Sequence, residues 1–332
     1  MNTSDNIILN NNIVLNNTIV DISDNIVLNT IIDVSNNSIV DVSNNSIVLD
    51  TIVDVSDNII TTLCFSSGGI KGLSFLGVLK KLEKNNIINL NNIKLYVGTS
   101  IGSLLGFLLN IGYSIEEIET FVLLFDFKKF VSEVNCIDFL NNCGIDNGEK
   151  FIFIITKLLE FKLNRTDITF KELYELTNKK LIIIGTNLTK LLEKEFNYET
   201  TPSCSILKAI RISCSIPIVF TPVQYEDDIY VDGALCNTFP MNYCNDKNTI
   251  GIYIKNGNTN FVLDSIKDMI FQCMAMVSNT MSEKYITTNK NVIVLDNFEG
   301  GLIDFNMPCE TKKKIIKTGN KFGKEFVKSY KK

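Results

Sequence analysis

Two stretches of this sequence share one arrangement, in which a short apolar run is followed by a turn of small residues and then by a helix pattern. The first apolar run covers residues 59–65, and a small-residue turn at residues 66–69 leads into leucines at helical spacing. The second run covers residues 93–97 and passes through residues 98–102 into an almost wholly apolar helix that ends near Leu109. Short apolar runs of this kind are typical of buried strands, and a helix that is apolar on every side is usually buried. Both units therefore predict a strand, a tight turn and a buried helix.

The alternation of strand and helix patterns continues along the chain. Residues 181–185 and 250–254 are predicted to form further central strands. Two helix starts have the spacing of a capping box: Ser114 with Glu117, and Thr169 with Glu172. The alternation predicts an α/β fold built on a mostly parallel sheet. No apolar run approaches the roughly 20 residues that a bilayer-spanning helix needs, so a transmembrane helix is not expected.

The chain of 332 residues contains no histidine. That absence excludes a Ser-His-Asp or Cys-His arrangement, histidine metal ligands and a histidine pH switch. A hydrolytic mechanism would therefore have to use carboxylate, amine or hydroxyl groups. Nine cysteines without a C-x-x-C pair suit structural thiols in a reducing compartment better than a disulfide framework.

A G-x-S-x-G pentapeptide lies between the second predicted strand and its helix. It runs from Gly98 to Gly102, with Ser100 at its centre. A nucleophilic hydroxyl in this position must stand on a sharp turn, and flanking glycines relieve the steric crowding that such a turn creates. The same string elsewhere would be an ordinary glycine-bounded turn. Its strand-turn-helix context is what predicts that Ser100 is a nucleophile.

The turn of the first unit, residues 66–72, reads S-S-G-G-I-K-G. Successive small residues at a helix N-terminus leave backbone N–H groups unpaired, and these can receive negative charge such as a developing oxyanion. The alternative is a phosphate or dinucleotide loop. It fits less well, because Ser67 stands where the first glycine of G-x-G-x-x-G is needed and no Lys-Ser/Thr pair of a P-loop follows.

A third motif, Asp232-Gly233-Ala234, follows the strand-like residues 228–231. An aspartate at a strand end beside glycine can approach another loop closely. Because the chain lacks histidine, Asp232 is the natural candidate to orient and deprotonate Ser100. Asp-Gly is also a very common turn dipeptide, so the pair of residues is informative only together with the other two motifs.

In this order and spacing, the three motifs resemble those of the patatin-like phospholipases. That family has an oxyanion loop of the form D/S-G-G-G-x-R/K-G, a G-x-S-x-G turn and a D-G-A/G strand end. The resemblance covers residues 61–242 and includes two further landmarks: A-I-R-I-S-C-S-I-P at residues 209–217 and G-T-N at residues 185–187. It implies a three-layer α/β fold with a central, mostly parallel sheet flanked by helices. It also implies a lipid acyl hydrolase that uses a Ser-Asp dyad and needs no cofactor and no metal.

The resemblance assigns roles to individual residues. It makes Ser100 the nucleophile and Asp232 its base, with Gly98 and Gly102 bounding the nucleophile turn. The remaining positions are the backbone amides of the oxyanion hole, Gly68, Gly69 and Ile70, and the motif-supporting residues Lys71, Gly72, Gly233, Ala234 and Arg211. The sequence departs from the family at Ser67, which replaces the first glycine of the loop and would be strained if the position required a positive φ.

Residues 1–58 form an Asn-rich segment that repeats itself. Residues 13–25 read IVLNNTIVDISDN and residues 26–38 read IVLNTIIDVSNNS, and shortened copies follow. The short β-branched runs could stack as a small β-coil, because turn-like clusters separate them. A repeat whose period drops residues stacks poorly, which favours a low-complexity or disordered segment. Residues 59–245 are then expected to form the catalytic domain, and residues 246–332 to complete it.

The C-terminal residues 312–332 contain nine lysines and one acidic residue, Glu325. A helix there would place Ile315, Phe322 and Phe326 on an apolar stripe between lysines. Such a helix could rest on an anionic lipid surface, or it could pack on the domain with a solvated basic face. Both alternatives stay open at the level of the sequence.

The charge distribution narrows the set of partners. The formal net charge is −5, and residues 1–60 hold eight Asp and no Lys, Arg or Glu, so the remainder carries +3. That total gives no support to nucleic-acid binding. The expected partner is a lipid substrate at a membrane or lipid-droplet surface, and protein partners are unknown. The thirty lysines against two arginines suggest an AT-rich genome, such as that of a large DNA virus or a protist. An intracellular, cytoplasmic or peripheral-membrane location follows, in a host cell if the source is viral.

Two other function classes remain as alternatives. One is a catalytically weak lipid-binding or interaction protein of the same fold, and the other is a nucleotide-binding enzyme that uses the Gly68-Gly69 loop. The sequence leaves open the head group, the acyl position and the choice among phospholipid, lysophospholipid and neutral glyceride. Residues 121–162, rich in Phe, Leu and Ile, are expected to form either a lid or core helices.

Overall fold

The computed structural model describes residues 59–130, 143–255, 266–296 and 306–331, together with the backbone of five short strands before residue 42. The chain divides into two units, Met1–Ile59 and Ile60–Lys332. In the first unit the strands form an antiparallel meander in chain order: β1 (Ile7–Leu9), β2 (Asn12–Leu15), β3 (Thr18–Ser23), β4 (Ile26–Asp33) and β5 (Ser38–Asp41). Residues 42–58 lie outside the described residues. Low complexity or disorder of this repeat therefore stays a prediction.

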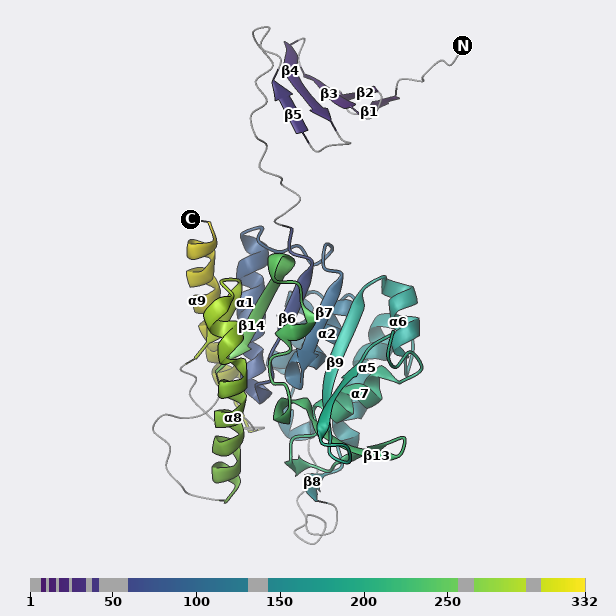
Figure 1. Cartoon of the computed structure of the whole chain (residues 1–332), viewed down its shortest axis with the longest axis vertical. Helices are drawn as coiled ribbons and strands as arrows, with labels where there is room; N and C mark the ends of the chain where they lie inside the picture. Colours follow the sequence, from purple (N-terminus) through teal and green to yellow (C-terminus); the bar gives the residue numbers. More distant parts are fainter. Residues whose placement is uncertain are drawn as a thin grey trace. The chain divides into compact units, whose positions relative to one another are not determined.

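The described part of the second unit is built on a sheet in the order β12-β13-β9-β7-β6-β14-β15, with β10 also paired to β9 (Figure 1). These strands are β6 (Thr62–Phe65), β7 (Leu95–Thr99), β9 (Lys180–Asn187), β10 (Leu192–Phe196), β12 (Val223–Tyr225), β13 (Asp228–Asp232), β14 (Thr249–Ile254) and β15 (Val292–Leu295). Neighbours among β9, β7, β6, β14 and β15 are parallel, whereas β10, β12 and β13 pair antiparallel. The predicted mostly parallel α/β sheet is confirmed.

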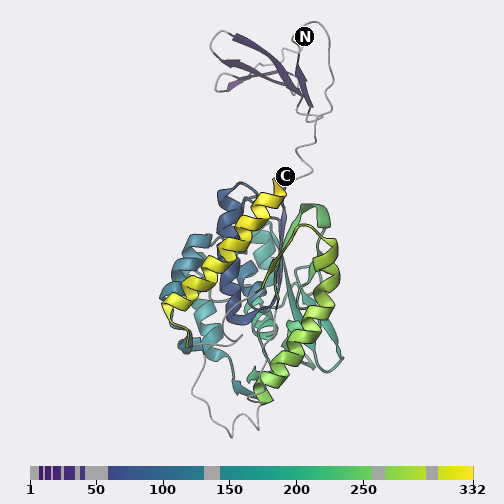
Figure 2. The same cartoon turned by 90° about the vertical axis from the view of Figure 1, so that its left-hand side faces the viewer.

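Helices cover both faces of this sheet. They are α1 (Leu73–Lys84), α2 (Ile101–Asn110), α3 (Ile115–Leu124), α5 (Glu149–Leu163), α6 (Phe170–Thr177), α7 (Ile206–Ser213), α8 (Ile266–Thr288) and α9 (Cys309–Tyr330). The helices α1 and α9 lie side by side, and α8 lies across the sheet from them (Figure 2). Side chains alternate along each strand, so Leu63 and Phe65 join the large core under α1 and α2 while Cys64 joins a smaller core that includes Tyr285 of α8. The three-layer prediction is confirmed.

The two predicted capping boxes are present. At the start of α3 the amide of Glu117 donates to Ser114 Oγ at 3.1 Å, and the amide of Ser114 donates to Glu117 Oε2 at 2.7 Å. Thr169 and Glu172 make the same reciprocal pair at the start of α6. Each box satisfies amides that would otherwise be unpaired in the first turn of its helix.

The basic C-terminal helix α9 packs on the domain, which was one of the two alternatives. Ile315 and Phe326 are buried, and Gly319 approaches α1 so closely that a Cβ there would lie 1.9 Å from the carbonyl oxygen of Ser74. Lys312 is also buried, and its Nζ donates to the carbonyls of Val122 (3.0 Å) and Phe125 at the end of α3. Within the described ranges, no helix is long and apolar enough to cross a bilayer.

Candidate active site

Ser100 stands on a sharp turn between β7 and α2. Its backbone has φ 55° and ψ −125°, a conformation that costs a non-glycine residue on the order of 1–3 kcal/mol. Two close approaches explain the flanking glycines: a Cβ on Gly98 would lie 2.4 Å from the carbonyl carbon of Gly102, and a Cβ on Gly102 would lie 2.6 Å from the carbonyl oxygen of Phe65. The two glycines of the G-x-S-x-G motif therefore allow the close backbone contacts that this turn requires.

Strand register brings Asp232 to the level of Ser100. Asp232 is paired with Gly185 on β9, and the preceding residue of β9, Ile184, is paired with Thr99 on β7. Ser100 Oγ donates a hydrogen bond of 2.7 Å to Asp232 Oδ2. The other carboxylate oxygen, Oδ1, accepts from the amide of Ala234 at 2.8 Å. Two residues separated by 132 positions in the chain thus meet at one edge of the sheet.

Burial strongly perturbs the Asp232 carboxyl. The residue is 2% exposed, and loss of solvation raises its pKa to about 7. The hydrogen bonds from Ser100 and Ala234 favour the ionised form and partly oppose that increase. A carboxyl with a pKa near 7 can both accept and return a proton at neutral pH.

The glycine loop after β6 is anchored at its two serines. The amide of Ser66 donates to the carbonyl of Ile252 at 3.1 Å, and the amide of Ser67 donates to the carbonyl of Thr238 at 2.8 Å. Ser67 does not have a positive φ, so its replacement of the family's glycine causes no strain. The left-handed conformation falls on Gly69 instead, with φ 54°, where the short helix η2 (Gly69–Gly72) begins.

The end of α7 and the segment that follows it position the pair. Ser213 Oγ accepts the amide of Ser100 at 2.8 Å and donates to the carbonyl of Ile184 at 2.6 Å. The carbonyl of Ser215 accepts the amide of Asp232 at 3.0 Å. Sequence reasoning did not select either serine as a site residue, although both lie in the A-I-R-I-S-C-S-I-P run that it compared with the family.

The residues expected to support the motifs are all at or near the site. Among them, the amide of Ala234 donates to Asp232 Oδ1. Arg211 is buried, and its guanidinium donates hydrogen bonds to the backbone carbonyls of Asn147 (2.9 Å) and Thr221 (3.0 Å). Lys71 is buried and lines neither cavity described below, and burial lowers its pKa. Gly72 and Gly233 are close-approach positions: a Cβ would lie 2.7 Å from the Ile101 side chain and 2.3 Å from the Ile184 carbonyl oxygen, respectively.

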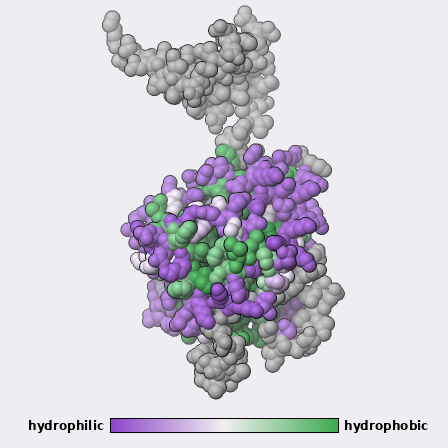
Figure 3. All heavy atoms as spheres, turned by 180° about the vertical axis from the view of Figure 1, so that it is seen from behind, coloured by the Kyte–Doolittle hydropathy of each residue, from purple (hydrophilic) through white to green (hydrophobic). Residues whose placement is uncertain are grey.

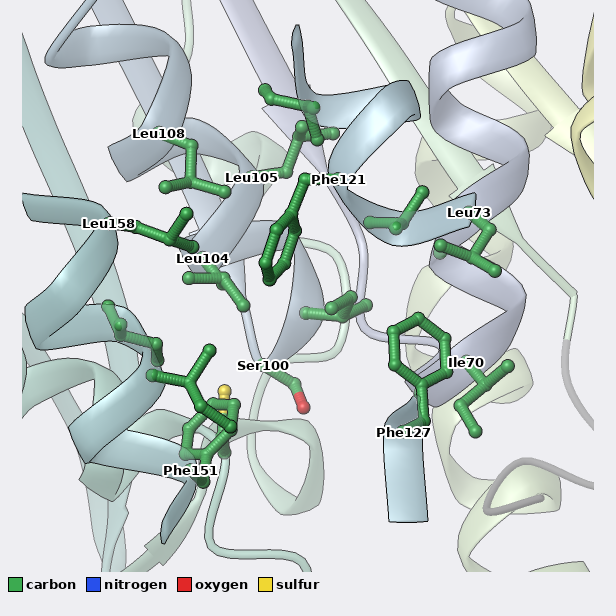
Figure 4. A pocket seen from close by; sticks show the side chains of 18 of the residues that line it. Ile70, Leu73, Ser100, Leu104, Leu105, Leu108, Phe121, Phe127, Phe151 and Leu158 are labelled. Atoms are coloured by element: carbon green, nitrogen blue, oxygen red, sulfur yellow. The ribbon is translucent and has the colours of Figure 1, made fainter. Parts of the chain in front are cut away.

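A largely apolar cavity of about 130 Å³ opens from Ser100 (Figure 4). Side chains from α1, α2, α3 and α5 surround it, and the Ser100 hydroxyl points into it (Figure 4). Its lining includes Leu73, Leu104, Leu105, Leu108, Phe121, Phe127, Phe151 and Leu158. Part of the segment expected to be a lid or core helices therefore forms this wall, as α3 and α5. Residues 131–142 of that segment lie outside the described residues.

A second, smaller cavity of about 50 Å³ lies at the same serine. Its lining is Ser67, Gly68, Gly69, Ser100, Ile216, Asp232, Ala234, Phe271, Met274, Ala275 and Ser278. The last four residues belong to α8, which the sequence did not associate with the site. Across the described ranges, no group of three Cys, Asp or Glu side chains is arranged to hold a metal ion.

These features define an α/β protein with a buried serine-aspartate pair at the mouth of an apolar cavity. The family model described as "Patatin-like phospholipase" matches residues 63–244, which is more than half of the chain. The chain belongs to the patatin-like phospholipase family.

Individual relatives extend the comparison. The chain is 36% identical over 193 residues to "Probable lipid hydrolase 463L" of Invertebrate iridescent virus 6, a match that covers 56% of this chain and 65%, less than two thirds, of that protein. It is 28% identical over 285 residues to "Uncharacterized protein R571" of Acanthamoeba polyphaga mimivirus, covering 81% and 94% of the two chains. Both relatives are viral, in line with one of the two origins that the composition suggests.

A solved structure shares the fold. The crystal structure of VipD from Legionella pneumophila superposes with a TM-score of 0.57 at 17% identity, covering 81% of this chain and 67% of that one.

Proposed function

We propose that this protein is a lipid acyl hydrolase that cleaves carboxylic ester bonds of glycerolipids, with Ser100 as nucleophile and Asp232 as base. The observation that carries the proposal is the 2.7 Å hydrogen bond from the Ser100 hydroxyl to a buried carboxylate, at the mouth of an apolar cavity. Family membership and the 36% identity to a probable lipid hydrolase support the same reaction class.

The reaction follows from this arrangement. Ser100 Oγ attacks the ester carbonyl carbon as its proton passes to Asp232, and the carbonyl oxygen becomes an oxyanion. In this proposal the backbone amides of Gly68 and Gly69, with Ile70 behind them, donate to that oxyanion; such a donor contributes about 3 kcal/mol to lowering the barrier. Collapse breaks the bond to the alcohol oxygen, which takes the proton from Asp232. Water then attacks the carbonyl carbon of the acyl-enzyme and loses a proton to Asp232. The bond between Ser100 Oγ and the acyl carbon breaks, Ser100 Oγ takes the proton from Asp232, and the fatty acid leaves.

The larger cavity supports a long-chain acyl group as substrate. Its walls are almost entirely hydrocarbon, and each buried methylene contributes about 0.8 kcal/mol to binding. An acetyl group would leave most of the cavity without contacts.

The two alternative functions make different predictions at Ser100. A catalytically weak lipid-binding protein of the same fold would bind lipid, but Ser100 would not react with a fluorophosphonate probe. A nucleotide-binding enzyme would be stabilised thermally by nucleotide. The nucleotide alternative fits the glycine loop poorly, because Asp232 lines the cavity beside Gly68 and Gly69, and its described lining residues include no lysine or arginine.

The pH dependence of catalysis should follow Asp232. Because the base must be ionised and its pKa is raised to about 7, kcat/KM should be constant above about pH 8 and fall about tenfold per pH unit well below pH 7. The measurement is hydrolysis of a long-chain nitrophenyl ester between pH 5 and 9. An acid limb centred near pH 4, the ordinary value for aspartate, would contradict the role of burial.

The face around the larger cavity is expected to contact the lipid surface. On the face of the second unit in Figure 3, apolar side chains gather near the centre and hydrophilic side chains surround them. The helices α3 and α5, which line the cavity, carry three exposed large apolar residues: Leu124, Phe153 and Phe161. The double variant Phe153→Asp, Phe161→Asp should lower binding to phosphatidylcholine/phosphatidylserine vesicles by about tenfold or more, since it removes two apolar groups and adds charge.

A matched control tests whether this effect is local. Leu191 is 86% exposed, comparable to Phe161 at 81%, but it lies between β9 and β10 and does not line the cavity. Leu191→Asp should leave vesicle binding unchanged. Equal loss in both variants would mean that general surface hydrophobicity, and not this face, controls binding. Hydrolysis of a short-chain soluble ester should be the same in all three proteins.

A further inference from the structure

Ser100 lies at the junction of the two cavities. Ser100, Gly69 and Ile216 line both of them, whereas Asp232 lines the smaller one and not the larger. An ester carbonyl carbon that bonds to Ser100 Oγ carries two groups, the acyl chain and the alcohol, which point away from it in different directions. The two cavities therefore offer one space for each group.

The proton transfers decide which group enters which cavity. In the proposed reaction Asp232 takes the proton of Ser100 and gives it to the departing alcohol oxygen, so that oxygen must come within hydrogen-bond reach of the carboxyl group. The water that attacks the acyl-enzyme loses its proton to the same carboxylate and must approach from the same side. The alcohol and the water therefore belong on the side of the smaller cavity, which leaves the larger cavity to the acyl chain.

The sizes and linings of the two cavities agree with this division. The larger cavity, about 130 Å³, is almost entirely hydrocarbon and suits a long alkyl chain. The smaller cavity, about 50 Å³, combines Asp232 and the glycine loop with Phe271, Met274 and Ala275 of α8. A water molecule needs roughly 10–15 Å³ of such space, so the smaller cavity holds the first atoms of an alcohol or the water that replaces it.

We propose that the smaller cavity receives the leaving alcohol, and that Met274 and Ala275 of α8 are specificity-determining residues that restrict the size of this alcohol. The inference rests on the proposed ester hydrolysis at Ser100 and extends it to the alcohol half of the substrate. The helix α8 (Ile266–Thr288) follows residues 63–244, which the family model matches. The alcohol preference is thus set outside the segment that this chain shares with the family.

One face of α8 is held against the site. Phe271, Met274 and Ala275 have the i, i+3, i+4 spacing of neighbours on a helix surface, and Ala275 is 4% exposed. Tyr285, farther along the helix, packs against the smaller core, whereas Met276 is 66% exposed. Because the side chain of Ala275 is a single methyl group, a larger side chain there would fill part of the cavity, and truncation of Met274 would enlarge it.

Two isomeric esters test the division of the substrate. Ethyl palmitate and hexadecyl acetate have the same formula and differ only in the direction of the ester group. With the full-length chain in the same mixed micelles, kcat/KM should be at least about tenfold higher for ethyl palmitate, because its long chain is on the acyl side. No preference, or a preference for hexadecyl acetate, would overturn the division.

Substitutions on α8 test its role with two palmitoyl esters, of ethanol and of 2-phenylethanol. The alcohol ratio is kcat/KM for the phenylethyl ester divided by that for the ethyl ester. Ala275→Met should lower this ratio about five- to tenfold, and Met274→Ala should raise it about threefold or more. Met276→Ala is the matched control: it is the same substitution on the same helix, but Met276 does not line the cavity. It should leave the alcohol ratio within about twofold.

A substitution in the larger cavity should have the complementary effect. Leu108 lines that cavity and lies farther from Ser100 than Leu104 does (Figure 4), roughly 12 Å along α2. Leu108→Phe should lower the acyl ratio, which is kcat/KM for ethyl palmitate divided by that for ethyl butyrate, about fivefold. It should leave the alcohol ratio within about twofold, and Ala275→Met should leave the acyl ratio within about twofold.

The outcomes separate this assignment from the proposed function. An alcohol ratio that Met274→Ala does not change, or an Ala275→Met protein whose acyl ratio falls as much as its alcohol ratio, would overturn the role of α8. If Ala275→Met does not fold, Met274→Ala decides by itself, because it only removes atoms. If the wild-type protein hydrolyses no ester and a fluorophosphonate does not label Ser100, the proposed function itself fails. Labelling of Ser100 with hydrolysis of ethyl palmitate keeps the proposed function, whatever the ratios of the variants.

Discussion

Replacing Ser100 by alanine should lower ester hydrolysis by a factor of at least about 1000 and abolish labelling by a fluorophosphonate probe. The Ser100 hydroxyl is the nucleophile in the proposed mechanism, and it lines both cavities. Among the described residues, no other serine hydroxyl is hydrogen-bonded to Asp232. The oxyanion donors and the acyl cavity remain in the variant, so a small residual rate above that of water is expected. The measurements are long-chain ester hydrolysis and the intact mass of the protein after probe treatment.

Two further variants make the result specific. Ser100→Gly should be equally inactive but at least as stable as the wild type, because glycine adopts the φ of 55° without strain. Ser329→Ala, on α9, changes a serine that lines neither cavity and should retain full activity and labelling. Substantial hydrolysis by the Ser100→Ala protein would show that another group is the nucleophile.

The variant Asp232→Asn should lose activity by a factor of at least about 1000 and, at alkaline pH, become more stable than the wild type. Asparagine can keep both contacts, accepting from the amide of Ala234 and donating to Ser100 Oγ, but it cannot take a proton. The gain in stability comes from removing a buried charge. The folded pKa of Asp232 is about 7 and the unfolded value is near 3.9, so the native state holds its proton more tightly than the unfolded chain.

The sign of the pH effect follows from that difference. Between about pH 4 and pH 7 the unfolded chain binds fewer protons than the native protein, so the free energy of unfolding falls as pH rises. A difference of roughly three pKa units corresponds to at most about 4 kcal/mol lost by pH 8. Urea denaturation should show Asp232→Asn more stable than the wild type at pH 8, with the gap closing toward pH 4. A gap that is independent of pH would mean that Asp232 is not desolvated in the native state.

Asp228, on the same strand, offers a control of opposite sign. Its carboxylate accepts hydrogen bonds from Lys190 (2.6 Å) and Asn187 (2.9 Å), and these contacts lower its pKa. A lowered folded pKa contributes stability that is present at neutral pH and is lost on acidification. Asp228→Asn should therefore be less stable than the wild type at pH 8, while hydrolysis by Ser100 and Asp232 continues.

Much of the turn at Ser100 could be predicted because its backbone conformation depends on residues close together in the chain. The conformation at Ser100 depends on the close approach of Gly98 and Gly102 within one pentapeptide, and a capping box depends on residues three apart. Patterns of this kind leave a direct signal in the sequence. The strand boundaries were less accurate, since the run predicted over residues 59–65 forms a strand only from Thr62 to Phe65.

The sequence alone determined the α/β alternation, the glycine-bounded turn at Ser100, the glycine loop and, through a family resemblance, the candidate pair of Ser100 and Asp232. Only the tertiary structure decided that these two side chains meet at 2.7 Å, that burial raises the pKa of the carboxyl to about 7, and that residues of α8 line the smaller cavity at Ser100. It also decided that α9 packs on α1. The physical reason is the distance along the chain between the residues that interact. Backbone conformation follows from residues a few positions apart, whereas solvation and cavity shape depend on contacts between segments far apart in the chain, as with the 132 positions between Ser100 and Asp232.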